Sequence, residues 1–99
     1  MSAFLICDVT VKDRAALSEY LRLSEHTLAP YSGKFHVQAG RVHKIEGDWS
    51  PTVVIVAEFP SSELAKNWYN SPEYSAALNV KPRAMDRHVI LVEGISKES

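Results

Sequence analysis

The sequence predicts an α+β fold, in which one antiparallel sheet is covered by helices on a single face. Two observations lead to this prediction: apolar, β-branched segments alternate with segments of helical periodicity, and the elements follow in the order β-α-β-β-α-β. That order is the split βαβ arrangement of ferredoxin-like folds. With 99 residues, of which 45% are apolar and 23% charged, the chain has the length and composition of one globular domain spanning residues 1–99.

The first strand is expected over residues 3–11, AFLICDVTV, because β-branched and aromatic residues dominate there and Gly and Pro are absent. Asp13 then provides a side chain that can cap a helix. Apolar residues recur after it at helical spacing, at positions 17, 20, 21 and 28. A helix is therefore expected over about residues 14–29, ending near Pro30 and the Ser32-Gly33 turn.

A hairpin of two strands is expected to follow. Residues 34–47 have strand character, and Gly40 within them predicts a bulge, because a glycine inside a strand commonly marks one. The segment EGDWSPT, residues 46–52, then predicts a turn. Residues 52–59, TVVIVAEF, are the most apolar run in the chain and predict a central strand.

The second helical region is expected to be broken at Asn70-Ser71-Pro72. An apolar face that includes Trp68 predicts a short first helix. Asn70 tolerates the left-handed conformation that closes a helix, whereas Ser71 and Pro72 suit the N-cap and the first position of a new helix. Residues 87–94, RHVILVEG, predict the last strand.

Alternation along the first strand separates two faces of the sheet. Odd-numbered residues point to one face, whereas Phe4, Ile6 and Asp8 point to the other. Helices cover only one face, and a domain this small is expected to cover the second by association, so we expect oligomerisation. Cys7 lies among the apolar odd-numbered residues and is therefore expected to be a small buried hydrophobe rather than a reactive thiol.

Composition and motifs exclude several function classes. The net charge of −1 offers no general attraction for nucleic acid, so no nucleic-acid partner is expected. The apolar run AFLIC reaches Asp8 too early for a signal peptide or a membrane span, and the single cysteine fits a reducing cytoplasm. GxGxxG, P-loop, CxxC and HExxH motifs are absent from the sequence, so no cofactor is expected.

The histidines do not predict a metal site. His36 and His43 are an odd number of residues apart, which places them on opposite faces of a regular strand unless a bulge at Gly40 reverses one of them. Metal sites need several converging ligands with a supporting second layer of hydrogen bonds, and no close spacing in the sequence supplies them.

Several segments together resemble the bacterial domain of unknown function 1330 family. These segments are SGKFHVQAG, IEGDWSP, VVIVAEFPS, AKNWYNSPEYSAA and VEG, and they cover most of the chain. The resemblance implies membership of the dimeric α+β barrel superfamily, in which two ferredoxin-like subunits join their open sheet faces around a cavity. The sequence departs from the family pattern at Ser32 and Ala39, where glycines are common. Arg83 matches a recurrent arginine, so the resemblance implies a ligand contact there.

Two carboxylates are candidates for the cavity. Asp8 shares the parity of Ile6 on the first strand, and Glu58 shares that of Val56 on the third, so both point to the open face. Buried in a cavity, either carboxylate would have a raised pKa and could act as a general base. The alternative is that both lie near strand ends and face water.

Basic and aromatic residues supply further ligand-binding candidates. Arg83 could present a planar guanidinium to a carboxylate ligand, or it could simply favour the C-terminus of a helix. Tyr69 is adjacent to the core residue Trp68 and so points elsewhere, where its phenol could bond a ligand. Trp49 either contacts a ligand or packs over the hairpin, and Glu58 is a further candidate contact.

These features leave three functional hypotheses open. The first is a binding protein whose apolar cavity, rimmed by Arg83 and Tyr69, holds a small organic acid. The second is a cofactor-free isomerase, lyase or monooxygenase, in which Arg83 orients the substrate and His36 or Asp8 moves a proton. The third is a dimeric scaffold without a ligand.

Overall fold

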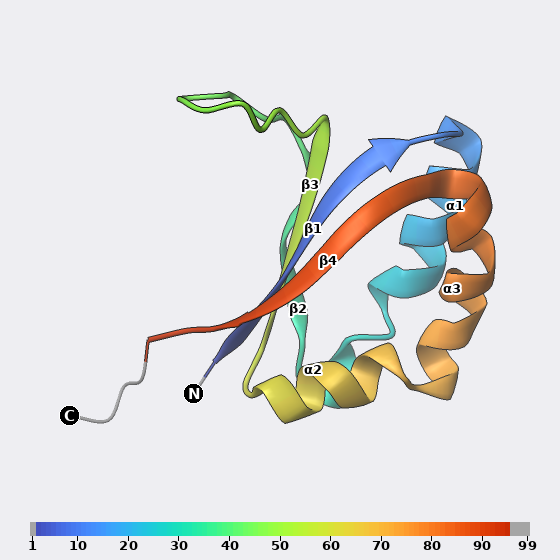
Figure 1. Ribbon diagram of the computed structural model, residues 1–99. Coiled ribbons are helices and arrows are strands. Elements are labelled where there is room, and N and C mark those ends of the chain that lie inside the picture. Colours follow the sequence, from blue (N-terminus) through green and yellow to red (C-terminus); the bar gives the residue numbers. More distant parts are fainter. Residues whose placement is uncertain (1, 96–99) are drawn as a thin grey trace.

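The computed structural model describes residues 2–95 (Figure 1). Its regular elements are, in chain order, β1 Ala3–Val11, α1 Arg14–Glu25, the short 3-10 helix η1 Ala29–Tyr31, β2 Lys34–Gly40, β3 Val53–Phe59, α2 Ser62–Tyr69, α3 Pro72–Ala84 and β4 Met85–Glu93. The predicted β-α-β-β-α-β order is confirmed, with the second helical region divided into α2 and α3.

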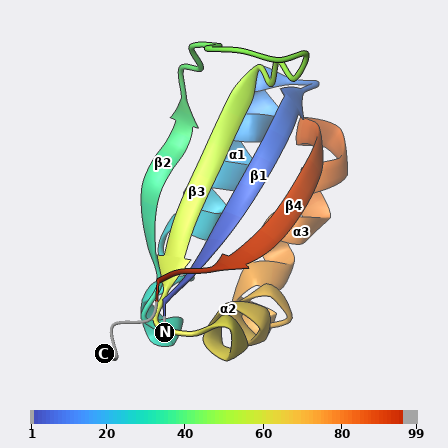
Figure 2. The same ribbon diagram turned by 60° about the vertical axis from the view of Figure 1, so that its left-hand side comes forward.

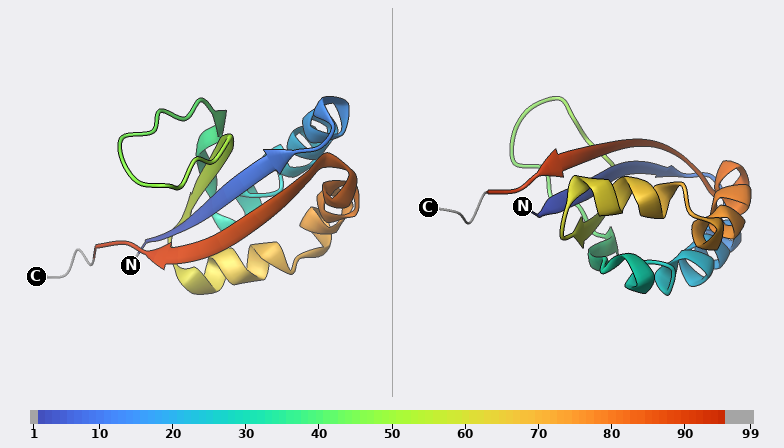
Figure 3. Two further views of the ribbon diagram at one scale, coloured as in Figure 1. Left: turned by 45° about the horizontal axis from the view of Figure 1, so that its top comes forward. Right: turned by 90° about the horizontal axis from the view of Figure 1, so that it is seen from below.

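The four strands form one sheet in the order β2-β3-β1-β4, and every pair is antiparallel. The strands lie side by side in Figure 2, with α1 and α3 behind them. The view from below in Figure 3 shows the helices on the same side of the sheet. The molecule is therefore an α+β structure of two layers, as the sequence predicts, with helices over one face and nothing from residues 2–95 packed over most of the other.

The predicted alternation along β1 is confirmed. Leu5, Cys7 and Val9 are buried against the helices, and Cys7 is only 1% exposed. The even-numbered residues face away from the helices; Phe4, Ile6 and Asp8 are half-buried, and Thr10 is exposed. This second face, called the open face below, also carries exposed apolar side chains from β4, Ile90 at 57% and Val92 at 42% exposure.

Helix α1 begins as expected but ends earlier. Asp13 accepts hydrogen bonds from the backbone amides of Ala15 and Ala16 through Oδ1, at 2.9 and 3.1 Å. The helix stops at Glu25, not near residue 29, because the chain turns at Thr27, whose amide bonds to the carbonyl three residues back. Thr27 is buried, so packing in the core, and not the continuation of the helix, fixes its position.

The break between α2 and α3 is confirmed. Ser71 Oγ donates to the carbonyl of Trp68 at 2.7 Å and accepts from the amide of Tyr74 at 3.2 Å, so one side chain ends the first helix and begins the second. Asn70 keeps φ at −95°, so the expected left-handed conformation does not occur. Strand β4 starts directly at Met85, two residues earlier than predicted.

The hairpin differs most from the prediction. Strand β2 ends at Gly40 rather than continuing to residue 47, and residues 41–52 form a loop that projects from the sheet on the side away from the helices (Figure 1). Pairing with β3 shifts register between Gln38 and Gly40, where Ala39 has φ of 63°. The predicted bulge is therefore present, with Ala39 in the strained position. A second shift, between Phe35 and Val37, lies next to His36.

Candidate functional site

An apolar groove runs along the helix side of the edge strand β4, between that strand and α2. Its volume is about 290 Å³. The residues that define this groove, called the β4 groove, include Leu5, Ala65, Tyr69, Val89 and Leu91. Val89 and Leu91 are register partners of Cys7 and Leu5 on β1, so the groove continues from the hydrophobic core.

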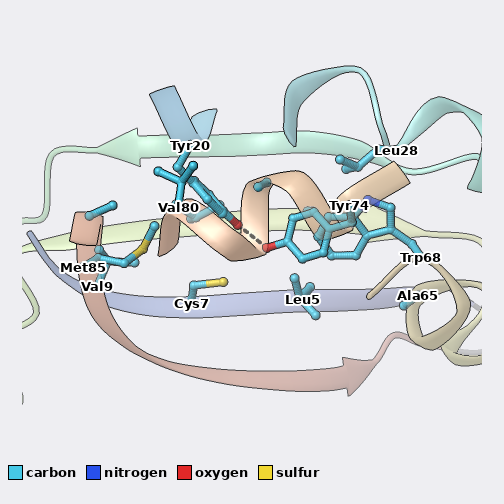
Figure 4. Packing of buried hydrophobic residues seen from close by; sticks show 14 of the residues in the cluster. Leu5, Cys7, Val9, Tyr20, Leu28, Ala65, Trp68, Tyr74, Val80 and Met85 are labelled. Atoms are coloured by element: carbon cyan, nitrogen blue, oxygen red, sulfur yellow. Dashed lines mark hydrogen bonds between the residues drawn. The ribbon is translucent and has the colours of Figure 1, made fainter. Parts of the chain in front are cut away.

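Arg87 lies one strand repeat beyond Val89, on the same face of β4. Its guanidinium donates to two phenols, from Nη1 to Tyr20 at 2.9 Å and from Nη2 to Tyr74 at 3.1 Å. The two phenol oxygens also bond to each other, and Figure 4 shows them meeting on the side of Cys7 and Leu5. The guanidinium carbon is 5.5 Å from the centre of the Tyr20 ring. We call these three residues the phenol–guanidinium cluster.

This cluster holds a positive charge without a carboxylate partner. Among residues 2–95 the ion pairs join Lys12 to Asp86, His36 to Glu58 and Arg83 to Glu19, and none of them includes Arg87. Removing an ion from water is costly unless an opposite charge or several hydrogen bonds replace the hydration. Arg87 is half-buried, so its guanidinium keeps part of its exposure to solvent and can accept an anion from that side.

Neither phenol supplies the missing negative charge. Burial raises the pKa of Tyr20 and, more strongly, that of Tyr74, so both stay protonated at neutral pH. Burial also raises the pKa of the Cys7 thiol on the neighbouring strand. The guanidinium charge is therefore uncompensated by the side chains around it.

The cluster also has more donors than acceptors. Both phenol oxygens accept from Arg87, and one phenol donates its proton to the other. The O–H of the second phenol then has no acceptor among the described residues. A guanidinium carries five N–H groups, of which these two bonds use two. The cluster thus offers donors and positive charge, which a carboxylate or enolate oxygen would satisfy.

The sequence-predicted residues divide between the two sides of the sheet. On the open face, the His36 and Glu58 side chains bond at 2.6 Å, and Trp49 Nε1 donates to Asp8 Oδ2 at 3.0 Å. The His36 bond lowers the pKa of Glu58 below its usual value. Both carboxylates therefore point to the open face, as their parity predicts.

The two open-face pairs are separated from each other. In the register of β1 and β3, Asp8 lies opposite Val54, whereas Glu58 lies opposite Phe4. Four residues of strand separate these positions, which corresponds to about 13 Å. His36 and Asp8 therefore belong to different ends of the face and do not form one catalytic cluster.

The other predicted contacts lie elsewhere. Arg83 is on the outer surface of α3, 65% exposed, with Nη2 3.7 Å from Glu19. Tyr69 lines the β4 groove on the helix side of the sheet. His43 is exposed in the loop after β2, which separates it from His36. No group of three potential metal ligands gathers anywhere in residues 2–95.

The phenol–guanidinium cluster was not predicted from the sequence. One signal was available: Arg87 shares the parity of Val89 and Leu91, so an arginine occupies a core-facing position of an apolar strand. Tyr20, on the apolar stripe of the first helix, and Tyr74 gave no separate signal, because buried tyrosines are common in cores. Only the packing of α1 and α3 brings both phenols to one guanidinium.

Comparison with known protein families assigns the chain to one of them. A family model described as Domain of unknown function (DUF1330) matches residues 2–95. The chain belongs to this family. The predicted family resemblance is thus confirmed, and the match covers all of the regular elements of this DUF1330 protein. A search of proteins with curated functions finds no match.

Solved structures with the same fold extend the comparison. A protein of unknown function from Rhodopseudomonas palustris is 21% identical, with a TM-score of 0.75 over 96% of this chain and 83% of the other. SnoaB, a cofactor-independent oxygenase from Streptomyces nogalater, is 12% identical, with a TM-score of 0.69 over 98% and 96%. A dimeric ferredoxin-like protein of unknown function from Thermobifida fusca is 15% identical, with a TM-score of 0.59 over 94% and 91%. At these identities the likeness shows the fold alone.

Within the described residues, no helix combines the length and the apolar composition that crossing a bilayer requires.

Proposed function

We propose that this DUF1330 protein binds a small organic anion in the β4 groove, with the anionic group at Arg87. The single observation that carries the proposal is the guanidinium of Arg87, which is bonded to two phenols and paired with no carboxylate in residues 2–95. Arg83, the ligand contact that the family resemblance implies, already lies beside Glu19. We therefore assign the anion to Arg87 rather than to Arg83.

The groove sets the shape of the ligand. Successive residues on one face of a strand are about 7 Å apart, so Arg87 lies one such step from Val89. Arg87 does not line the groove itself, so an apolar body between Val89, Leu91 and Tyr69 would need a terminal carboxylate or enolate that extends beyond Val89 toward the guanidinium. The fork of an arginine suits the two oxygens of a carboxylate. The ligand class is an organic acid with a compact apolar or aromatic body.

We further infer that the protein acts as a homodimer joined through its open faces. Ile90 and Val92 are exposed on the open face. A small domain gains stability by covering such a surface. Two of the structurally similar proteins are described as dimeric.

A cytoplasmic location also belongs to this proposal, because a reducing compartment suits the single free cysteine.

A second candidate function is proton transfer at His36. The observation that favours it is the 2.6 Å bond between His36 Nε2 and Glu58 Oε1, because a carboxylate that accepts from one imidazole nitrogen leaves the other nitrogen as a base. A second subunit over the open face would exclude water from this pair. This function differs from the enzyme hypothesis drawn from the sequence, because Arg83 lies beside Glu19 on α3. It predicts turnover that depends on His36 and is retained in Arg83 variants.

The binding proposal is tested with benzoate as the anionic probe and benzyl alcohol as a neutral probe of similar size. Isothermal titration of the wild type should detect benzoate and much weaker binding of the alcohol. Arg87→Gln should raise the Kd for benzoate about tenfold or more, since a hydrogen bond to a charged group contributes about 1.5–3 kcal/mol. Arg22→Gln, on the exposed surface of α1, is the matched control and should bind as the wild type does.

Two outcomes would contradict the binding proposal. Equal Kd values for Arg87→Gln and the wild type would remove Arg87 from the site. A loss of benzoate binding in Arg83→Gln instead would return the site to the residue predicted from the sequence. Because Arg87→Gln loosens the phenol–guanidinium cluster, circular dichroism must show that the variant is folded. Tyr74→Phe is a second variant, which retains the ring and removes the hydroxyl that accepts from Arg87.

A further inference from the structure

A second concave site lies on the opposite side of the sheet from the β4 groove. Its volume is about 250 Å³. Five residues line it and define what we call the Trp49 pocket: Ile6, Asp8, Trp49, His88 and Ile90. Four of them come from β1 and β4 on the open face, and the fifth comes from the loop after β2.

Strand register gives the floor of this pocket a simple pattern. Ile6 pairs with Ile90, and Asp8 pairs with His88, so an apolar pair and a polar pair lie side by side. Trp49 reaches this floor from a point 41 residues away in the sequence and is anchored by its bond to Asp8. The pocket therefore has apolar walls and a single carboxylate at one end.

The carboxylate of Asp8 is only partly used within the protein. Its Oδ2 accepts from the Trp49 indole at 3.0 Å, and no other hydrogen bond to the carboxylate occurs in residues 2–95. None of the ion pairs among these residues includes Asp8. One carboxylate oxygen and one negative charge therefore remain available to a ligand.

The charges around Asp8 favour a cation. The ionisable neighbours on the open face are His88 on β4 and Asp86, one strand repeat beyond it. Asp86 lies 3.9 Å from Lys12, which offsets its charge, so Asp8 is the carboxylate of this region that lacks a cationic partner among residues 2–95. Arg87 lies on the helix side of the same strand, where it bonds to the two phenols. The two sides of the sheet thus have opposite charge preferences.

We propose that the Trp49 pocket binds a small organic amine. Its ammonium group donates to the free Oδ1 of Asp8, and its apolar body lies on Ile6 and Ile90 beneath the indole of Trp49. An aromatic face near a cation adds a further attraction. Trp49 is 64% exposed, so the indole is accessible from outside the protomer. A second copy over the open face would form the outer wall of the same pocket.

This inference is independent of the anion site, because the pockets share one lining residue, Ile90 at the edge strand, but neither their charge preference nor their polar residues. The test uses benzylamine, which is protonated at neutral pH, with benzyl alcohol and benzoate as neutral and anionic probes of similar size. Titrations by calorimetry should show saturable binding of the amine that exceeds binding of the alcohol. Asp8→Asn keeps an oxygen that can accept from Trp49 while removing the charge. It should raise the Kd for benzylamine about tenfold or more.

Asp48→Asn is the matched control, because it removes an exposed carboxylate next to Trp49 in the sequence and should leave the Kd for the amine unchanged. Trp49→Phe should weaken binding while retaining the preference for amine over alcohol. Equal affinities for benzylamine and benzyl alcohol, or an unchanged Kd in Asp8→Asn, would overturn the proposal. Light scattering of each variant fixes the oligomeric state, so that a changed assembly is not mistaken for a lost site.

Discussion

The indole Nε1 of Trp68 donates to the hydroxyl of Thr27 at 2.9 Å, and both residues are buried. Thr27 in turn donates to the carbonyl of Ser24 at 2.6 Å. This chain of two bonds joins α2 to the end of α1 and satisfies the polar atom of a large core aromatic. Removing the threonine hydroxyl would leave the indole N–H buried without a partner.

Thr27→Val should therefore destabilise the protein. An unsatisfied buried donor costs about 1–3 kcal/mol, so the free energy of unfolding in urea should fall by that amount. Thr10→Val is the matched control, because Thr10 is exposed on β1, and it should change the stability by less than about 0.5 kcal/mol. Equal effects of the two variants would show that the Trp68 bond contributes little.

Gly33→Ala should be destabilising for a steric reason. A Cβ at Gly33 would clash with Cε1 of Phe59, and that ring is fully buried against Trp68 at 5.4 Å between centroids. Such overpacking costs about 1–3 kcal/mol. The cost should shrink when Phe59→Leu is present, and a double-mutant cycle of unfolding free energies measures this coupling. Additive effects would contradict the steric explanation.

The bond between His36 and Glu58 should make the stability of the protein decrease as the pH falls into the acid range. Because this bond lowers the pKa of Glu58 in the folded state, its contribution is fully present above the ordinary pKa of 4.5. The contribution is lost as the pH falls through the lower folded-state pKa. The difference in Tm between the wild type and Glu58→Gln should therefore shrink on acidification. Glu46→Gln, in the exposed loop, should show no such change.

Substitution on the open face should weaken self-association. Ile90 is 57% exposed at the centre of β4, so Ile90→Asp would place a charge in the proposed interface. Light scattering should show a dimer for the wild type and more monomer for this variant at the same concentration. Ile95→Asp, at a residue that is 91% exposed beyond β4, is the control and should remain dimeric. A monomeric wild type would contradict the dimer proposal.

Element types and order could be read from the sequence because they depend on local periodicity. The alternation along β1 and the Ser71-Pro72 restart require only neighbours along the chain, and both are found as predicted. Boundaries were less accurate where distant contacts decide them. Helix α1 ends early at Thr27, whose partner Trp68 is 41 residues away. Strand β2 ends at Gly40, because residues beyond it are not paired with β3.

Among the candidate site residues, the sequence by itself determined which ones face the open side of the sheet. The parity of Asp8 and Glu58 was sufficient for this, since side chains alternate along a strand. Only the tertiary structure decided which groups meet. Arg87 bonds to phenols that are 67 and 13 residues away, and helix packing rather than spacing brings them together. Periodicity fixes the direction of a side chain, whereas its partners depend on the three-dimensional arrangement of the elements.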